Sequence, residues 1–502
     1  PGSSSVSTAF PRAERPAHAL TTSKGLTARG VVGSALAMLG GFMTNDLPPG
    51  PVRDVLAPLH WLYQQQLGRV AGWIIVAAGM LLLAWAWVDL VRATRHTPRD
   101  GVAQRAATAV VRRLTALWAL PWLIAPPMFS HDGWSYLAQG ALTQSGRDPY
   151  VVSPGEMPEL LTSMVDPIWR YTPTPYGPLP LTWGALCTEV VKEPTVLVWL
   201  QRVPIIIGLV LTAWAVPRLA RRLDVSPALA SALTLASPLM LAHGFGGEHN
   251  DVLLMGLVTV ALVWAAAGRW VWATVFVGIA AGVKFTAIVA VVPVVLLSLP
   301  VGVDLRRRFA RLAQAGLLGA LVTALCGIPY GLGVGWIRAL SVPGVVVTPA
   351  SIPTALGYLP RYFFGFISDE AGDLAMSLIR GAGMGLAVIL VIWAALRRPT
   401  GKLPSAMVTN AGVFAAVVLL APVVHSWYAF TVLPCGVLLA MRTRRIHLVM
   451  TLGVASALTV MWDTTLAGAS LLVAAVVVAA HQFALTRRRD DLPPRVRRWL
   501  SA

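Results

Sequence analysis

Acids, histidines and a lysine interrupt or follow the apolar segments of this 502-residue sequence, and these are the residues that could do chemistry. Asp132 directly follows the apolar segment 114–129 and opens a long polar segment, 130–194. A carboxylate at such a place can act as a general base that takes a proton from a hydroxyl group. An Asp just before a helix can also cap it by accepting hydrogen bonds from the first free N–H groups. Spacing alone leaves both roles open.

The hexapeptide GGEHND, residues 246–251, forms a polar turn between two apolar segments. Gly, Asn and Asp favour turns and would explain a simple connection. Glu248, His249 and Asp251 exceed what a turn needs, which favours a binding or catalytic role for them.

Two cations lie inside apolar segments, where an unpaired charge is costly. Lys284 interrupts the apolar stretch from Val271 to Leu299. Its amine could extend to the membrane interface, but an anionic partner is the preferred interpretation. Arg202 lies a few residues into the segment 195–217 and is interpreted in the same way, with an acid of a neighbouring helix as the alternative partner.

Aromatic residues accompany these charges. Trp427 and Tyr428 end another apolar segment and are typical of the interface belt of membrane proteins, whereas the adjacent His425 is harder to explain in this way. Tyr150 and Tyr176 lie in turns that contain proline. An exposed ring there could stack on a sugar or only shape the loop.

The residues after Asp132 must form the element that positions it. Trp134, Leu137, Ala138 and Leu142 recur with helical spacing on one face. This periodicity predicts an amphipathic helix that lies on the membrane surface rather than crossing it.

The composition requires several membrane spans. The chain is 56% hydrophobic and 12% charged, and its mean hydropathy of +0.67 is too high for a soluble domain. A bilayer core of roughly 30 Å needs about 20 helical residues per span. Apolar segments near this length recur between residues 30 and 486 without the alternation of strands. We therefore predict an all-α polytopic membrane protein with about 14 transmembrane helices.

The net charge of +18 needs no nucleic acid to explain it. The basic residues form short clusters between apolar segments, as the positive-inside rule predicts for cytoplasmic loops. Cys187, Cys326 and Cys435 are too few and too scattered for a disulfide framework or a metal knot, and we interpret them as packing residues.

The same clusters divide the chain and orient it in the plasma membrane. We expect both termini in the cytoplasm, no cleavable signal, and a first span that serves as the targeting signal. The expected regions are a disordered tail (1–29), two extra spans with a basic loop (30–113), a core (114–330) with an outer catalytic loop (130–194), a second outer loop (331–374), C-terminal spans (375–486) and a basic tail (487–502).

In this orientation the acids, histidines, cations and aromatic rings share the outer side of the membrane. Such a pocket suits a substrate with an anionic head on a lipid tail and a hydroxyl-rich portion in water, such as a polyprenyl-phosphate sugar. In a single displacement, a carboxylate takes the proton of the acceptor hydroxyl while fixed cations stabilise the departing phosphate. An Asp of ordinary pKa, about 3.9, is a weak base, so proton transfer would come late in the step.

An Asp in the first large outer loop, followed by a helix and a Pro-Tyr turn, resembles the GT-C glycosyltransferases. The set HDGWSYLAQG, DPY, TPYGP, GGEHND, GVKFT and HSWYAF is similar to the polyprenol-phosphomannose-dependent α-1,6-mannosyltransferases of mycobacteria and corynebacteria. The resemblance runs from about residue 110 to 465. It implies a GT-C-like helical bundle, with two further spans before the Asp loop whose role stays open.

By this resemblance, Asp132 would be the general base, and Lys284 and Arg202 would bind the donor phosphate. The donor would be polyprenyl-phosphate-β-mannose, and transfer with inversion to a mannosylated phosphatidylinositol or growing mannan would build the backbone of lipomannan and lipoarabinomannan. No cofactor or metal is implied, although the acidic pairs could hold an ion. The residues expected to line the pocket are His131, Glu248, His249, Asp251, His425, Trp427, Tyr428, Tyr150 and Tyr176.

Two other classes remain open. A glycolipid transporter or flippase would also be polytopic, but transporters tend to place coupling charges near the midplane, whereas the candidates here gather at one face. A structural subunit of an envelope-building complex would leave the outer charges as solvated turns. Protein partners cannot be read from the sequence, and residue types alone do not separate a mannosyl- from an arabinosyl- or glucosyltransferase.

Overall fold

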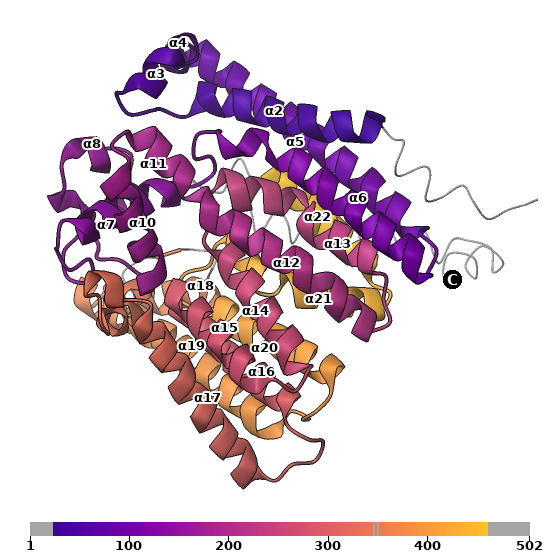
Figure 1. Cartoon of the computed structure of the whole chain (residues 1–502). Helices are drawn as coiled ribbons and strands as arrows, with labels where there is room; N and C mark the ends of the chain where they lie inside the picture. The colour runs from indigo at the N-terminus through magenta and orange to yellow at the C-terminus, as the bar shows by residue number, and fades with distance from the viewer. Residues whose placement is uncertain (1–23, 345–346, 349–350, 460–502) are drawn as a thin grey trace, which may run out of the picture.

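The computed structural model describes residues 24–344, 347–348 and 351–459, and every regular element within them is a helix (Figure 1). This confirms the all-α prediction for the described part of the chain. The predicted span 465–486, the basic tail 487–502 and the first 23 residues of the predicted N-terminal tail lie outside the described residues.

Six helical segments of the described residues are long and apolar enough to cross a membrane, or seven if one bent pair counts as a span. The six are α2 (Lys24–Thr44), α5 (Gln66–Arg95), α11 (Pro194–Leu200) continued by α12 (Arg202–Arg222), α17 (Leu305–Leu325), α19 (Asp369–Arg397) and α20 (Leu403–Leu420). The protein is therefore a polytopic membrane protein. Among the described residues, full-length spans are fewer than the predicted number of about 14, because the other apolar helices found there are short. These are α14 (Asp251–Ala265), α15 (Trp270–Val283), η4 (Phe285–Ala290) with α16 (Val291–Ser298), α21 (Leu433–Arg442) and α22 (Ile446–Thr459).

At the N-terminal end, α2 and α5 pack along each other at one edge of the molecule (Figure 1). Glycines permit the close approach: a Cβ at Gly33 would lie 2.9 Å from the carbonyl oxygen of Gly79. Two short helices, α3 (Pro51–Val55) and α4 (Ala57–Gln64), connect the pair.

The predicted span 114–129 is not a continuous helix. α6 (Gly101–Ala119) ends early, and only the short η1 (Pro121–Leu123) separates it from a non-helical stretch that reaches Ser130. Pro121, Pro126 and Pro127 explain the interruption, because proline lacks the backbone N–H that continues a helix.

The helix predicted after the acid is present as α7 (Asp132–Gln144), but it does not lie on a surface. Every residue from Asp132 to Thr143 is buried. Its polar face is covered too, since Gln139 accepts a hydrogen bond from Thr174 at 2.9 Å. The surface location was therefore wrong: α7 is enclosed by the rest of the segment 130–194, which forms η2 (Pro154–Glu156), α8 (Glu159–Thr162), α9 (Pro167–Arg170) and α10 (Pro178–Val190).

α13 (Pro227–Leu235) and the π-helical η3 (Met240–Gly246) form the bent pair, with an angle of 49° between them. Pro238 lies in the break and prevents one straight helix. Because η3 ends at Gly246, the bend leads directly into the polar turn 246–251, and α14 begins at the last residue of that turn.

The second predicted outer loop, 331–374, is partly helical. α18 (Ile352–Gly365) packs against α19 as a hairpin and exposes Leu359 and Phe363. Shorter turns precede it, namely η5 (Ile328–Tyr330), η6 (Gly335–Leu340) and η7 (Val342–Gly344), and η8 (Ser426–Thr431) follows α20.

We expect the substitution Gly140→Ala to destabilise the protein, because α7 packs on α10 at this glycine. A Cβ at Gly140 would lie 2.5 Å from the carbonyl carbon of Gly184, and backbone atoms cannot move aside as a side chain can. The cost should be about 1–3 kcal/mol in the free energy of unfolding, measured as a lower Tm of purified protein in detergent.

Gly412→Ala in α20 is the matched control, because nothing lies within 4 Å of a Cβ at Gly412. Alanine there should be neutral or stabilise by about 0.5–1 kcal/mol. Equal Tm values for the two variants would contradict the close packing of α7 on α10.

Candidate active site

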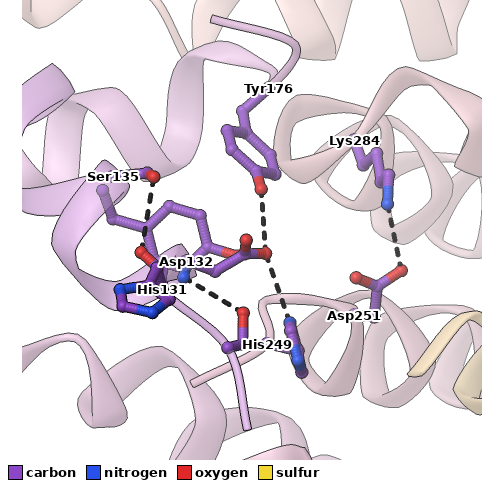
Figure 2. Close-up of polar contacts among 9 residues, drawn as sticks. His131, Asp132, Ser135, Tyr176, His249, Asp251 and Lys284 are labelled. Carbon is purple, nitrogen blue, oxygen red and sulfur yellow. Dashed lines mark hydrogen bonds and ion pairs between the residues drawn. The ribbon is translucent and has the colours of Figure 1, made fainter. Parts of the chain in front are cut away.

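Asp132 lies at the start of α7, and its carboxylate is held by one side chain of the same helix and two from distant parts of the chain. Oδ2 accepts a hydrogen bond from the Tyr136 hydroxyl at 3.2 Å. It also accepts one from the Tyr176 hydroxyl at 3.0 Å, and Nδ1 of His249 lies 3.2 Å away (Figure 2). These bonds all end on Oδ2, so Oδ1 remains for a substrate hydroxyl. The side chain is 12% exposed, which leaves a narrow access from solvent.

Asp132 does not act as the N-cap of α7, which was its alternative role. His131 is the N-cap residue, and Asp132 is the first residue of the helix. The Asp132 carboxylate accepts from side chains, while its backbone N–H donates to Oγ of Ser130 at 3.1 Å.

The surroundings of Asp132 keep its carboxylate ionised. Burial alone would raise the pKa of Asp132, but the hydrogen bond from His249, the electrostatic influence of His249 and His425 and the Tyr176 hydroxyl outweigh burial and lower the pKa to about 2. Burial raises the pKa of the Tyr176 phenol well above its usual range. The phenol therefore stays protonated and remains a donor.

His249 is held in a stack of aromatic rings. Its imidazole lies 3.8 Å from the ring centroid of Trp427 at an interplanar angle of 12°, and the His425 ring lies 4.3 Å from that of Trp427 at 6°. Two imidazoles this close to one indole cannot share a face, so they cover both faces of Trp427. The stack fixes the plane of His249 and thus the direction of its bond to Asp132.

Lys284 has the anionic partner that the sequence suggested. Nζ lies 3.4 Å from Oδ1 of Asp251 (Figure 2). It also lies 4.0 Å from the ring centroid of Tyr428. The Lys284 side chain is 19% exposed, whereas that of Asp251 is 4% exposed. Asp132 acts electrostatically on both Lys284 and Tyr428, so these groups belong to one site.

Arg202 does not lie where a phosphate could reach it. Its side chain is 1% exposed, and Nη2 forms an ion pair of 2.8 Å with Glu248, which is completely buried. The guanidinium also donates to backbone carbonyls, including those of Phe245 and Ala125. Arg202 is therefore paired with an acid from another element, which was the alternative interpretation of the sequence. Both Arg202 and Glu248 are too deeply buried to line an open pocket.

The other predicted pocket residues differ in where they lie. Tyr176 reaches Asp132, as described above. Tyr150 is only 4% exposed and packs in a separate cluster with Leu181 and Trp336, so the expectation of an exposed stacking ring was wrong. The exposed His131 points away from Asp132, and its Nδ1 lies 2.9 Å from the carbonyl oxygen of Met164 (Figure 2).

Two residues of the site, Tyr136 and His243, were not predicted from the sequence. Tyr136 follows Asp132 by one helical turn, and this spacing could have indicated that its hydroxyl reaches the carboxylate. His243 lies 5.9 Å from both the His249 and Trp427 rings. A histidine inside the apolar segment before the turn was the signal that could have found it.

In the part of the chain that the structure describes, no group of three or more His, Cys, Asp or Glu side chains is arranged to hold a metal ion. What the arrangement offers is a fixed carboxylate, a nearby amine and a stack of imidazoles. These groups can take a proton from a hydroxyl and stabilise an anion.

Comparisons with known proteins agree with this chemistry. Residues 27–300, more than half of the chain, match the family described as alpha-(1->6)-mannopyranosyltransferase, N-terminal domain. Residues 194–422 match glycosyltransferase family 87. No solved structure shows significant similarity to the chain.

Curated relatives point to the same family. An alpha-(1->6)-mannopyranosyltransferase A of Corynebacterium glutamicum is 30% identical over 403 residues, which cover 76% of this chain and 81% of the relative. The protein of the same name from Mycobacterium tuberculosis is 34% identical over 343 residues, 65% of this chain and 63% of the relative. An alpha-(1->6)-mannopyranosyltransferase B of Corynebacterium glutamicum is 28% identical over 429 residues, 80% of this chain and 70% of the relative. With its fixed carboxylate and polytopic helical fold, this chain belongs to the alpha-(1->6)-mannopyranosyltransferases, a family of glycosyltransferases.

Proposed function

We propose that this mannosyltransferase moves mannose, with inversion, from polyprenyl-phosphate-mannose to a mannosylated lipid acceptor. The acceptor is a mannosylated phosphatidylinositol or a growing mannan, and the product is an α-1,6 linkage of lipomannan or lipoarabinomannan. The observation that carries the proposal is the Asp132 carboxylate, held through one oxygen beside the Lys284 amine.

Asp132 acts as the general base. The acceptor hydroxyl attacks the anomeric carbon from the face opposite the phosphate, the bond from that carbon to the phosphate oxygen breaks, and its electrons leave with the phosphate. The hydroxyl proton passes to Oδ1 of Asp132. Because the pKa of Asp132 is about 2, the carboxylate removes the proton late, when bond formation has already made the hydroxyl acidic.

Lys284 binds the phosphate of the donor. Its amine is partly exposed. The negative charge of Asp132 acts on this amine, so the cation and the base belong to one site. Asp251 and the Tyr428 ring balance this charge. A phosphate would take up the remaining hydrogen-bonding capacity of the amine and gain stability as its negative charge grows during transfer.

The aromatic residues near Asp132 shape the sugar pocket. Trp427 does not offer a free ring face on which the sugar could stack. Both faces of Trp427 are covered by imidazoles, so this indole supports His249 and His425. Tyr428 is half-buried beside this stack, so part of its side chain can reach the mannosyl group.

The helices form a GT-C-like bundle whose site opens to the outer side of the plasma membrane, with cytoplasmic termini. Two features support this orientation. The basic clusters of α12 and α17 lie at Arg221 and Arg222 and at Arg306 to Arg308, which the positive-inside rule assigns to the cytoplasm. A polar turn and a partly exposed lysine next to short apolar helices suit the interface where a lipid phosphate resides.

The substitution Asp132→Asn tests the base. Asparagine keeps the shape and still accepts hydrogen bonds from the two tyrosines, but it cannot take the proton. We expect the rate of mannose transfer from labelled polyprenyl-phosphate-mannose to a mannoside acceptor to fall by about 10²–10⁴, with an unchanged elution profile and Tm.

Glu156→Gln is the matched control, because Glu156 is a carboxylate of the same segment whose side chain is 60% exposed. Its rate should equal that of the wild type. Transfer by Asp132→Asn at the wild-type rate would remove Asp132 from the mechanism.

The substitution Lys284→Met tests the phosphate site. Loss of the cation should lower kcat/KM for the donor by about 10²–10³, and Lys284→Arg should retain part of the rate because it keeps the charge. Free polyprenyl phosphate should inhibit the wild type and no longer inhibit Lys284→Met at the same concentration.

Lys192→Met serves as the control, since Lys192 donates to the carbonyl oxygen of Thr188 and has no place in the site. Because Lys284→Met leaves Asp251 unpaired, the double variant Lys284→Met/Asp251→Asn checks that the loss is not a folding defect. Full inhibition of the folded double variant by polyprenyl phosphate would exclude Lys284 as the phosphate ligand.

A further inference from the structure

Arg202 holds two separate segments of the chain together from a fully buried position. Its Nη2 donates to the carbonyl oxygen of Ala125 at 2.9 Å, in the segment that leads to Asp132. Its Nε donates to the carbonyl oxygen of Phe245 at 3.1 Å, in the segment that leads to His249. One guanidinium thus connects the backbone upstream of the base with the backbone upstream of its histidine donor.

Glu248 completes this connection from the other side. Its Oε1 lies 2.8 Å from Nη2 of Arg202, and the side chain is 0% exposed. Its Oε2 lies against Gly133, where a Cβ would collide with it. Oε2 has no hydrogen-bond partner among the described residues, but it faces the first turn of α7, where the helix dipole favours a negative charge. Glu248 therefore links Arg202 to the helix that carries Asp132.

Both connected segments contain strained backbone close to the site. Phe129 has a φ of 64°, and Glu248 has a φ of 56°. Residues other than glycine rarely adopt this left-handed conformation, and it persists where the surroundings impose it. The backbone N–H of Met128 also donates to the carbonyl oxygen of Gly246 at 2.7 Å, which joins the two strained segments directly.

We propose that Arg202 and Glu248 form a positioning pair, which sets the geometry of Asp132 and His249 without touching the substrate. This inference rests on the proposed function of the site. A buried ion pair is a poor source of stability, because desolvation offsets the attraction and apolar residues of similar size often serve as well. Apolar residues cannot replace the directional bonds from one guanidinium to both segments. The pair therefore serves geometry, and a displacement of about 1 Å at a catalytic group can cost about 100-fold in rate.

Glu248→Gln and Arg202→Lys test the pair through kinetics. Glu248→Gln keeps the shape of the side chain but removes its charge, so kcat should fall about 100-fold. The KM for the donor should change by less than about threefold, since Lys284 is untouched. Arg202→Lys keeps the charge but not the several N–H groups of the guanidinium, so kcat should fall about tenfold.

The double variant Arg202→Met/Glu248→Leu separates positioning from stability. It removes both charges together, so no buried charge is left alone and Tm should recover relative to the single variants. A positioning pair predicts that kcat stays low in this variant. If kcat returns together with Tm, the pair is only structural and the inference is wrong.

Arg308→Lys is the matched control for the loss of a buried guanidinium. Arg308 is 7% exposed and donates to carbonyl oxygens of Ala395, Leu396 and Arg398 at the end of α19. It contacts none of the site residues among the contacts of the described chain. This variant should lower Tm with an unchanged kcat. An equal loss of kcat in Arg308→Lys and Arg202→Lys would overturn the inference.

Hydrogen–deuterium exchange tests the pair without any activity. In Glu248→Gln, peptides that cover residues 124–131 and 245–250 should exchange faster than in the wild type, because the bond between Met128 and Gly246 loses its support. Unchanged exchange in these peptides would refute the positioning role. If wild-type protein transfers no mannose while exchange still rises in the variant, the proposed function fails and the structural link between the two segments stands.

Discussion

The ionised carboxylate of Asp132, placed where helices leave little room for water, is the constraint on which the rest of the site depends. A buried charge is costly unless hydrogen bonds and opposite charges compensate it. The donors come from three places in the chain, namely Tyr136 in α7, Tyr176 before α10 and His249 before α14. To satisfy one oxygen, the fold must bring these elements together. It also leaves the other oxygen for a substrate.

The turn 246–251 organises the charges around this carboxylate. Glu248 pairs with Arg202, His249 with Asp132, and Asp251 with Lys284. Side chains that are close in sequence thus reach three partners in different directions, and the left-handed backbone at Glu248 is part of how they diverge. One short turn therefore contacts the buried Arg202, the base Asp132 and the proposed phosphate ligand Lys284. This is why it contains more ionisable residues than a simple connection needs.

The lengths of the helices also reflect the position of the site. Helices that lack functional side chains, such as α2, α5 and α19, are long enough to span a bilayer, whereas α14 and α15 beside the site are short. Irregular backbone is tolerated at membrane depth only where protein covers it or water reaches it. The non-helical stretch before Asp132 meets this condition, because Arg202 and the backbone N–H of Met128 engage its surroundings. Breaks in the helices are thus concentrated where polar groups can satisfy them.

The sequence by itself determined the class of the protein and most of its reactive groups. Composition required a polytopic helical protein. A carboxylate directly after an apolar segment indicated Asp132, a turn with more ionisable residues than a turn needs indicated His249 and Asp251, and a cation inside an apolar segment indicated Lys284. Only the tertiary structure decided which charges pair, so it moved Arg202 from the phosphate site to Glu248, buried Tyr150, and added Tyr136 and His243. It also enclosed α7, which periodicity had placed on a surface. The physical reason is that periodicity records which face of a helix is apolar, whereas the partner of a charge and the cover of a polar face depend on residues far away in the chain.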